Sequence, residues 1–508
     1  MELEPIIGLE IHVQLTTKSK MFCSCANIFG DVPPNTAICP ICMGYPGTLP
    51  VPNKQAIDWI QKAGAALNCE LAQESRFDRK HYFYPDLPKG YQISQFDKPF
   101  CGKGHLTIDV DGQEKTIGIT RIHLEEDAAK NTHPKGADYT LVDYNRAGTP
   151  LIEIVTEPDI RTPAEAKAFL QELQRIMRTL GISTADMEKG QMRADANISL
   201  RPALQQGEAR PSDGRPVDKN KLYPKTEVKN VNSFKFVEKA LAHEIERQTK
   251  MWEAGETPTH ATRGFDSNTG KTTLQRTKEE AADYRYFPEP DIPSFSFAKE
   301  ELETIKEHLP ELPRQKILRL VGQTGVARQH AALLTEEKVL ADFFEEVVSE
   351  LEQLDNERVE VSRQEIPILM KLAVSVILRD VRKMAQANNV TGLGDLKLNA
   401  ENFAELMALL HAGKINNQSV GKVVEEMHKT GGDPDAIIQN LGLEQVSGAD
   451  DLQKIVDEVV SEQADTVAKI KAGKEAAIQF LMGQVMAKSS GKANPKTIIE
   501  MLRKTILG

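Results

Sequence analysis

The sequence predicts an α+β fold, in which an antiparallel-sheet domain is followed by two all-helical domains. Residues 1–293 are rich in short alternating segments, glycine and proline, and they contain few long helical patterns. After the proline-bearing stretch 288–293, a helical periodicity continues to the C-terminus, with a softer break near Gly413. We therefore expect a sheet domain at 1–293 and helical domains at 294–412 and 413–508.

The size and composition of the chain agree with several domains. Its 508 residues and 56.4 kDa exceed one ordinary core, because domains usually span roughly 100 to 200 residues. No apolar run approaches the roughly 20 residues that cross a bilayer, and the N-terminus lacks the pattern of an export signal. We therefore expect a cytoplasmic protein without membrane contact.

The charge distribution limits how the chain could bind nucleic acid. The net charge of −11 argues against binding by bulk attraction, since such proteins are usually basic throughout. From Asp465 to Gly508, however, eight Lys and Arg residues stand against three acidic residues, so this tail is net +5 and the remainder is near −16. A solvated helix face would give the same pattern. Any RNA contact is expected to be local to the tail.

One helix within the sheet domain can be placed from its ends. Thr162 is a suitable N-cap, Pro163 suits the first helical position, Glu165 lies three residues after the cap, and Gly181 ends the pattern. Its apolar residues recur on one face, which should pack on the sheet. They are Ala166, Phe169, Leu170, Leu173, Ile176, Met177 and Leu180. The charged segment 203–220, which bears Pro and Gly, is predicted to be an exposed hairpin excursion.

Four cysteines form two close pairs, Cys23 with Cys25 and Cys39 with Cys42. Four thiolates satisfy a tetrahedral Zn²⁺ ion and leave no position for a substrate, so a zinc site here would be structural. The alternative is four unligated thiols, but the spacing within both pairs favours zinc. The other two cysteines lack such partners and are expected to be buried as apolar residues.

Several predicted strands bring acidic side chains to a polar face. In the first strand Ile7, Leu9 and Ile11 alternate with polar residues, so Glu10 and His12 project from the same face. The other acids of this kind are Asp195 in residues 192–201, Glu227 in residues 224–230, and Glu125 and Glu126 in residues 120–127. Together they could hold hard cations, with Mg²⁺ and a nucleotide as the natural candidates. A solvated face of an antiparallel sheet gives the same alternation, so the pattern leaves both interpretations open.

A glycine-rich segment at 264–272 resembles a phosphate-binding loop but fails its spacing. Five residues separate Gly264 from Gly270 where that motif requires four, and no apolar strand precedes it. We predict a hairpin turn at residues 268–270 instead. A nucleotide would therefore be bound without this motif.

Three long motifs are distinctive in this sequence: FDRKHYFYPDLPKGYQISQ at 77–95, VDYNRAGTPLIEIVTEPD at 142–159 and DYRYFPEPD at 283–291. All three resemble motifs of the GatB family, the B-subunit family of aminoacyl-tRNA amidotransferases, to which the archaeal relative GatE also belongs. The resemblance extends from Ile7 into the tail at 491–495 and so covers essentially the whole chain. Ala194 departs from it, in a motif that usually has Cys.

The resemblance implies a fold and a set of site residues. The family's N-terminal cradle domain is similar to the glutamine synthetase and guanido kinase fold, which holds Mg²⁺ and ATP on an antiparallel sheet. The implied metal and phosphoryl-transfer positions are Glu10, His12, Glu125, Asp195 and Glu227. Glu125 and Lys89 are the implied catalytic residues, with Lys89 near the entry of ammonia. Spacing does not separate Glu125 from its alternative Glu126. The implied tRNA-binding residues of the tail are Lys474, Lys488, Lys492 and Lys496.

The resemblance also implies a reaction and its partners. It indicates a ligase that uses ATP and glutamine-derived ammonia to convert mischarged Glu-tRNA(Gln), Asp-tRNA(Asn) or both to Gln-tRNA(Gln) and Asn-tRNA(Asn). The chain has no glutaminase signature, so ammonia is expected from an amidase partner, GatA, bridged by a small partner, GatC, in a heterotrimer. A metal-dependent hydrolase and a non-catalytic tRNA scaffold are the alternative hypotheses.

Overall fold

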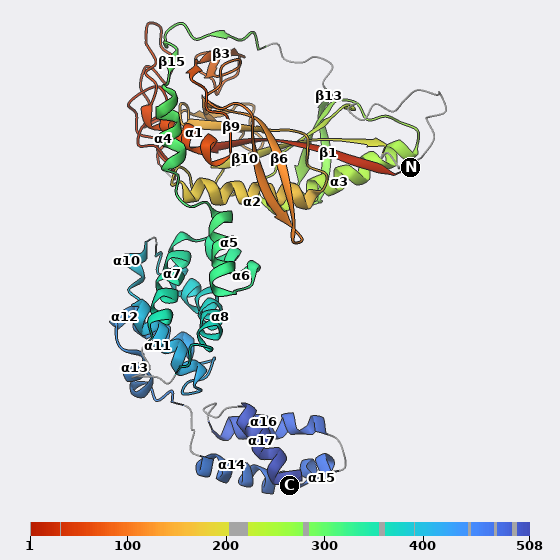
Figure 1. Ribbon diagram of the computed structural model, residues 1–508. Helices are drawn as coiled ribbons and strands as arrows, with labels where there is room; N and C mark the ends of the chain where they lie inside the picture. Colours follow the sequence, from red (N-terminus) through yellow and green to blue (C-terminus); the bar gives the residue numbers. More distant parts are fainter. Residues whose placement is uncertain are drawn as a thin grey trace. The chain divides into compact units, whose positions relative to one another are not determined.

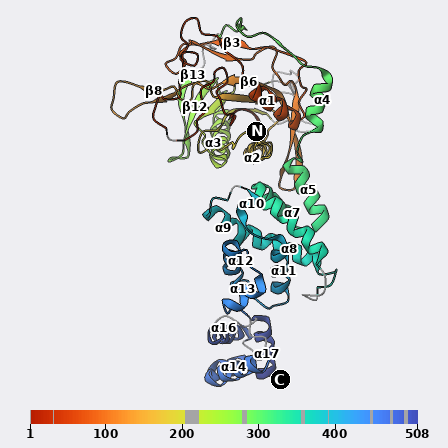
Figure 2. The same cartoon turned by 90° about the vertical axis from the view of Figure 1, so that its left-hand side faces the viewer.

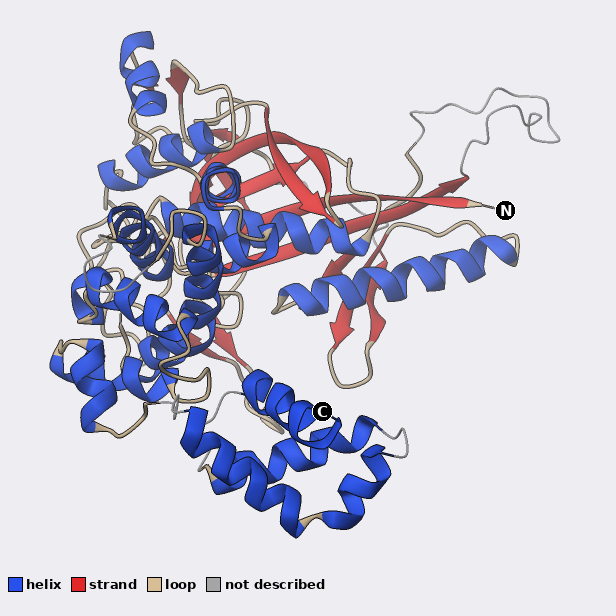
Figure 3. Cartoon of the chain, turned by 60° about the horizontal axis from the view of Figure 1, so that its bottom comes forward, coloured by secondary structure: helices blue, strands red, loops and turns tan. Residues whose placement is uncertain are grey.

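The computed structural model describes residues 2–30, 32–202, 222–277, 284–354, 361–390, 392–444, 449–471, 475–489 and 495–507. The chain divides into two compact units, Met1–Leu312 and Pro313–Gly508 (Figure 1). Within the described residues, the strands lie in the first unit and the second unit is helical (Figure 3). The chain is therefore of mixed α+β class with a helical C-terminal region, as the sequence predicts.

Eight strands of the described chain form the main sheet, in the order β13-β12-β11-β10-β1-β9-β6-β5. Neighbours are antiparallel except β11 and β12, which are parallel. The bounds are β1 Leu3–Gln14, β5 Gly104–Val110, β6 Gln113–Glu126, β9 Pro150–Thr156, β10 Met192–Pro202, β11 Thr226–Lys229, β12 Ala261–Asp266 and β13 Lys271–Thr277. The turn between β12 and β13 confirms the predicted hairpin at 268–270.

Smaller sheets and four helices complete the first unit. The remaining strands are β2 Glu74–Ser75, β3 Asp78–His81, β4 Tyr91–Ser94, β7 Lys130–Thr132, β8 Leu141–Asp143, β14 Phe287–Pro288 and β15 Phe295–Ser296. The helices are α1 Lys54–Ala66, α2 Pro163–Thr179, α3 Phe234–Glu253 and α4 Lys299–Glu307. Helices α2 and α3 lie along one face of the main sheet, and β3 lies on the opposite side (Figure 1 and Figure 2). The main sheet is thus covered on both faces.

Local sequence patterns explain the elements that pack on the helical side. The alternating apolar residues of β1, among them Ile7, Leu9 and Ile11, are at most 1% exposed. Burying a large aliphatic side chain contributes about 1.5 to 3 kcal/mol, so this alternation sets which face turns inward. Helix α2 begins as predicted, because the Thr162 hydroxyl accepts a hydrogen bond from the Glu165 backbone N–H at 3.2 Å. Its predicted apolar stripe lies in the same core.

The second unit contains two hydrophobic cores. The first is built from residues between Ile317 and Ile438, and the second from residues between Leu452 and Ile506. The elements are α5 Pro313–Thr324, α6 Arg328–Thr335, α7 Lys338–Gln353, α8 Ile366–Val376, η1 Ile377–Val381, α9 Arg382–Ala387, α10 Leu393–Leu396, α11 Ala400–His411, α12 Val420–Thr430, α13 Pro434–Asn440, α14 Ala449–Glu462, α15 Ala464–Lys471, η2 Glu475–Ala477, α16 Ile478–Lys488 and α17 Pro495–Leu507.

The described units can be compared with the predicted end of the sheet domain at residue 293 and with the predicted excursion at 203–220. The first unit extends past the proline cluster to Leu312 and includes α4, which packs against α1. The predicted excursion at 203–220 lies outside the described residues. In the part of the chain that is described, no helix is both long enough and apolar enough to cross a membrane.

Candidate functional site

The order of the strands brings polar side chains together on the face of the main sheet away from α2 and α3. Strand β9 lies between β1 and β6, and β10 lies on the other side of β1. Directly opposite residues in antiparallel strands share a face. Glu10 is opposite Asp195, His12 is opposite Glu153, and Glu153 is opposite His123. Four neighbouring strands therefore contribute carboxylates and imidazoles to one region.

His12, Glu125 and Glu153 form a close polar cluster on this face. Nε2 of His12 lies 3.3 Å from Oε2 of Glu153 and 3.6 Å from Oε1 of Glu125. Nε2 of His123 lies 3.3 Å from the same Glu153 oxygen and 3.6 Å from Oε2 of Glu125. Ser94 on β4 donates a hydrogen bond to Glu125 at 3.0 Å. One ligand atom from each of His12, Glu125 and Glu153 can lie within 4.8 Å of the others.

The cluster is electrostatically balanced by its own histidines. Burial opposes ionisation of Glu153, but the charge of His123 and the hydrogen bond from His12 hold its pKa well below the usual range. Burial also acts against protonation of His123, yet the charge of Glu153 and contact with Glu125 raise its pKa to about 9. Burial opposes protonation of His12, but the hydrogen bond with Glu153 raises its pKa. Burial opposes ionisation of Glu125, but the hydrogen bond with His123 lowers its pKa.

This donor set fits a divalent cation. Two ionised carboxylates and one imidazole within reach of a single centre are a common ligand combination for such ions. A freely solvated sheet face does not describe this region, because Glu125 is 2% exposed and His123 is 3% exposed. A bound cation would supply positive charge beside both carboxylates. His12 and Glu125 were predicted ligands, and the structure places them together.

Sequence reasoning missed Glu153 and His123. Both carried a signal: Glu153 alternates with the buried Ile152 and Ile154, and His123 shares a strand face with Glu125 two residues later. What was missing was the position of β9 between β1 and β6, because pairing between distant segments is not visible in local patterns.

The other predicted metal ligands lie on the same face but have partners of their own. Glu10 accepts a hydrogen bond from the Asn197 side chain at 2.9 Å. The ammonium group of Lys229 bridges Asp195 at 2.7 Å and Glu227 at 3.1 Å. In the described structure these three acids are therefore paired with neighbouring polar groups, and they are not within the His12 cluster.

A pocket of about 340 Å³ opens over the cluster. It combines acidic side chains with several cationic ones and is walled by residues of several strands. The lining includes His12, Lys80, Tyr82, Gln92, Glu125, Asp127, Arg193, Asp195 and Lys229. A cavity that presents both charges can bind a phosphate-bearing substrate together with the cation that neutralises it.

The structure separates Glu125 from Glu126, which spacing alone did not. Glu126 faces away from the His12 cluster: its Oε1 lies 2.6 Å from Lys89 Nζ and accepts a hydrogen bond from the Ile93 backbone N–H at 3.0 Å. Lys89 and Glu126 line a second pocket of about 230 Å³, together with Cys42 and other residues of the cysteine-bearing loop. The second proposed catalytic residue, Lys89, is thus in this other pocket.

The four clustered cysteines converge as a single site. One Sγ atom from each lies within 4.8 Å of the others, and Sγ of Cys39 and Cys42 are 3.9 Å apart. Thiolates at about 2.3 Å around a tetrahedral ion have this spacing. The hydrogen bond from Cys23 lowers the pKa of Cys42 to about 5 although burial acts against it, and the same hydrogen bond raises the pKa of Cys23. Burial raises the pKa of Cys25 to about 11. Cys69 and Cys101 are 2% and 0% exposed, which confirms that they are buried.

The predicted tRNA-binding lysines of the tail are described only in part. Lys488 Nζ lies 2.8 Å from Glu458 and 2.7 Å from Glu462, so it links α16 to α14. Lys474 and Lys492 lie outside the described residues, and of Lys496 the helical backbone is described but the side chain is not. Binding of tRNA by these lysines stays a prediction.

Comparisons with known proteins agree with this geometry. Residues 5–303 match the family described as the GatB/GatE catalytic domain, and residues 342–506 match the family described as the GatB domain. The His12 cluster and the cysteine cluster both lie within the first match.

Similar proteins are found over the full length of the chain. A protein of Thermodesulfovibrio yellowstonii is 44% identical over 507 residues, covering 100% of both chains. One of Persephonella marina is 45% identical over 508 residues, again covering 100% of both. Each is named as the B subunit of an aspartyl/glutamyl-tRNA(Asn/Gln) amidotransferase. The chain therefore belongs to the GatB family of tRNA amidotransferase components, and with it to the ligases that form carbon–nitrogen bonds.

Proposed function

We propose that this chain activates the side-chain carboxyl group of a mischarged tRNA and holds that tRNA while ammonia is added. The substrates would be Glu-tRNA(Gln), Asp-tRNA(Asn) or both, and the products Gln-tRNA(Gln) and Asn-tRNA(Asn). The observation that carries the proposal is the cluster of His12, Glu125 and Glu153, of which His12 and Glu125 line a pocket with mixed charge. The family match over residues 5–303 supports it.

The chemistry needs an activation step because a carboxylate oxygen is a poor leaving group. In the first step the bond between the β,γ-bridging oxygen and the γ-phosphorus of ATP breaks, and a carboxylate oxygen bonds to that phosphorus. ADP leaves with the electron pair. In the second step the ammonia nitrogen bonds to the acyl carbon, phosphate leaves with the electron pair of the broken carbon–oxygen bond, and the nitrogen loses a proton to give the amide.

Residues of the main sheet would organise the first step. His12, Glu125 and Glu153 would hold a divalent cation, for which we propose Mg²⁺. When bound, this ion would neutralise phosphate charge and so lower the repulsion toward the carboxylate. Glu10, Asp195 and Glu227 lie on the same face and are proposed as ligands of a second cation or of its water shell. We also propose that the unit has the cradle fold seen in glutamine synthetase and guanido kinases.

Ammonia would reach the acyl group from the side of Lys89 and Glu126. Their ion pair of 2.6 Å lines the second pocket, next to the cysteine-bearing loop. Glu126 would be the proton acceptor for ammonium arriving there. The ammonia itself would come from the amidase partner GatA, with the small partner GatC completing a heterotrimer. The basic tail would contact the tRNA.

The cysteine cluster would have a structural role. We propose that Cys23, Cys25, Cys39 and Cys42 bind Zn²⁺, because four convergent thiols provide a closed tetrahedral shell. Such an ion has no open position for a substrate. It would stabilise the loop that forms one wall of the second pocket.

The decisive experiment is ATP hydrolysis by the complex of this chain with GatA and GatC. Mischarged Glu-tRNA or Asp-tRNA should stimulate ADP release, because the acceptor carboxylate completes the site. Glu125→Gln and Glu153→Gln should abolish that stimulation and weaken Mg²⁺ binding measured by calorimetry. Glu157→Gln is the matched control, since Glu157 bonds to Thr120 and does not face His12.

Each alternative hypothesis gives a different result in this experiment. A metal-dependent hydrolase would act on the tRNA substrate without ATP. A non-catalytic scaffold would leave amidation intact in both Gln variants. Wild-type ADP release that does not respond to mischarged tRNA would rule out the proposed activation step.

A further inference from the structure

Arg193 is a cation in the candidate active site to which the proposed ligands give no role. It lies on β10 directly opposite His12 on β1. Its side chain lines the 340 Å³ pocket with Glu125 and Asp195. Its guanidinium group therefore lies beside the proposed cation site but is not one of the ligands of that site.

Arg193 is held by a buried carboxylate. Its Nη2 donates a hydrogen bond of 2.9 Å to Oδ1 of Asp127, which is 4% exposed. Asp127 is itself fixed by Gln14, whose Nε2 donates to Oδ2 at 2.7 Å, and by the Ala128 backbone N–H at 2.9 Å. Nε of Arg146 lies 3.7 Å from the same Oδ2. The neighbouring backbone and side chains from two other parts of the chain therefore set the position of the carboxylate that orients Arg193.

The guanidinium group of Arg193 has N–H donors that can bind a ligand. Among the described residues, the hydrogen bond of Arg193 is the one to Asp127, and it uses one terminal nitrogen of a group with five N–H donors. The charge of Asp127 outweighs burial and raises the pKa of Arg193. The group is therefore a permanent cation with a fixed direction.

The other cations of the pocket are arranged differently. The ammonium of Lys229 is shared between Asp195 and Glu227. The ammonium of Lys80 lies over the ring of Tyr284, 4.9 Å from its centroid. Arg193 alone among these three presents a planar fork, which matches two phosphoryl oxygens at once.

We propose that Arg193 is a catalytic residue that binds the phosphoryl group during its transfer, and that Asp127 is the positioning residue that orients it. The inference rests on the proposed function. While the phosphorus–oxygen bond to ADP breaks and the bond to the carboxylate forms, the N–H groups of Arg193 donate to the non-bridging oxygens. No proton leaves the guanidinium. Because its direction is set before substrate binds, its charge stabilises the transition state without reorganisation.

The test measures acyl phosphate formation directly. The complex with GatA and GatC is incubated with ATP, Mg²⁺ and Glu-tRNA, and hydroxylamine traps the activated side-chain acyl group as a γ-hydroxamate. Only the ATP-dependent γ-hydroxamate is counted, because hydroxylamine also cleaves the aminoacyl ester to an α-hydroxamate. Removing one transition-state donor typically lowers kcat by about 10² to 10³ fold. We expect this loss for Arg193→Gln. Arg201→Gln is the matched control, because Arg201 lies on the same strand, pairs with Glu4 and does not line the pocket.

Two further variants keep the test decisive if Arg193→Gln does not fold. Arg193→Lys keeps a cation for Asp127 but loses the fork, so kcat should fall at least about tenfold while calorimetric Mg²⁺ affinity stays at the wild-type value. Asp127→Asn should lower kcat with little change in KM for ATP, a split that a purely structural role would not produce. Wild-type kcat in folded Arg193→Lys would overturn the inference. Absence of hydroxamate in the wild type would instead overturn the proposed function on which it rests.

Discussion

Neighbouring acidic residues on one strand have separate environments in this protein. Glu125 and Glu126 are consecutive on β6, and the pleat turns their side chains to opposite sides. Glu125 contacts His12 and His123, whereas Glu126 pairs with Lys89 in the second pocket. Both are at most 3% exposed, so each depends on its own cationic partner. One strand can therefore serve two pockets with adjacent residues.

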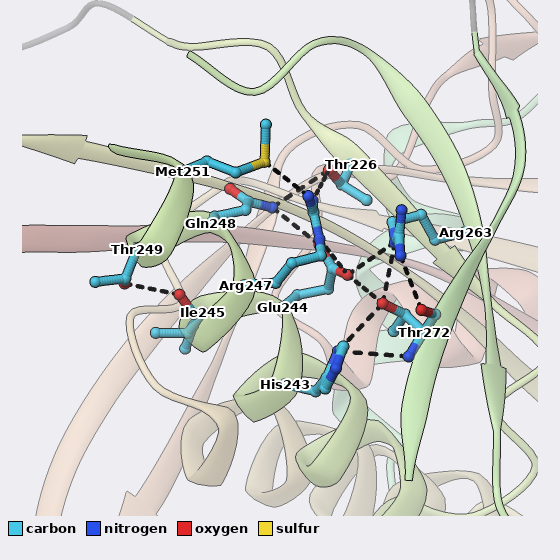
Figure 4. Close-up of polar contacts among 10 residues, drawn as sticks. All are labelled: Thr226, His243, Glu244, Ile245, Arg247, Gln248, Thr249, Met251, Arg263 and Thr272. Atoms are coloured by element: carbon cyan, nitrogen blue, oxygen red, sulfur yellow. Dashed lines mark hydrogen bonds and ion pairs between the residues drawn. The ribbon is translucent and has the colours of Figure 1, made fainter. Parts of the chain in front are cut away.

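A second buried carboxylate, Glu244 on α3, supports the packing of the helix on the sheet. Its oxygens accept hydrogen bonds from Arg247 at 2.8 Å, from Gln248 at 3.2 Å and from the Thr272 hydroxyl, and Nε of Arg263 lies 3.1 Å away (Figure 4). Burial alone would raise the pKa of Glu244, but the hydrogen bonds from Arg247 and Thr272 bring it below the usual range. The ionised form is thus favoured by folding.

We predict that Glu244→Gln destabilises the first unit in a pH-dependent way. At pH 7 the loss should be about 3 to 5 kcal/mol, because two arginines lose a buried partner. A carboxylate whose pKa is lowered by folding stabilises the folded state at pH values above its pKa in the unfolded chain, about 4.3. This contribution disappears as the pH falls through the pKa of the folded state. Urea unfolding measured from pH 7 down to pH 3 should therefore show that the difference in unfolding free energy between variant and wild type becomes smaller.

The control for this prediction lies on the same helix. Glu246 pairs with Lys250 at the surface of α3, so Glu246→Gln should change the unfolding free energy little at any pH. If the loss of unfolding free energy in Glu244→Gln stayed constant over the whole pH range, ionisation of Glu244 would not contribute to stability.

At the scale of elements, the cysteine-bearing loop has little regular structure and must be ordered by side chains. Asn145 holds part of it, accepting a hydrogen bond from the Ala37 N–H and donating one to the Pro33 carbonyl, both at 2.8 Å. Lys20 is fully buried, with Nζ 3.2 Å from the Tyr144 carbonyl and 3.8 Å from Cys42 Sγ. Its charge would partly neutralise four metal-bound thiolates. A bound ion would offset the entropy lost on ordering this loop.

We predict that Cys42→Ser loses bound zinc and loosens the loop. One thiolate fewer opens the tetrahedral shell, so metal analysis should find far less than one zinc per chain, and limited proteolysis should cut between residues 23 and 46 more rapidly. Cys69→Ser is the matched control, since Cys69 is buried elsewhere and should keep full zinc. Full zinc in purified Cys42→Ser would contradict the assignment.

At the scale of the whole molecule, the two units have hydrophobic cores with no shared residues. The core of the first unit runs from Ile7 to Ile292, and the two cores of the second unit begin at Ile317. Apolar burial is the main favourable term in folding, so a segment that contains its own core can fold alone.

We therefore predict that a fragment comprising residues 313–508 folds independently. Far-ultraviolet circular dichroism should give a helical spectrum and a cooperative thermal transition. As a control, Phe343→Ala in the same fragment should lower the midpoint, because removing a fully buried phenyl ring costs about 3 to 5 kcal/mol. A spectrum without helix, or a melt without a transition, would show that this unit needs the first one.

Much of the fold and part of the site could be predicted from sequence. Alternation of apolar and polar residues identified β1 and β10, and the N-cap with the apolar stripe identified α2. Both signals depend on residues only a few positions apart in the sequence. The same alternation placed Glu10 and His12 on one face of β1, and Asp195 on a polar face of β10. Long motifs indicated the family, which the full-length relatives confirm.

By itself, then, the sequence determined the fold class, the strand faces, the cysteine grouping and the family. Only the tertiary structure decided that β9 separates β1 from β6, which adds Glu153 to His12 and Glu125, and that Asp127 fixes Arg193. It also showed that part of the polar face is buried. The physical reason is that periodicity records which way a side chain points, whereas the neighbours it meets depend on pairing between segments far apart in the chain.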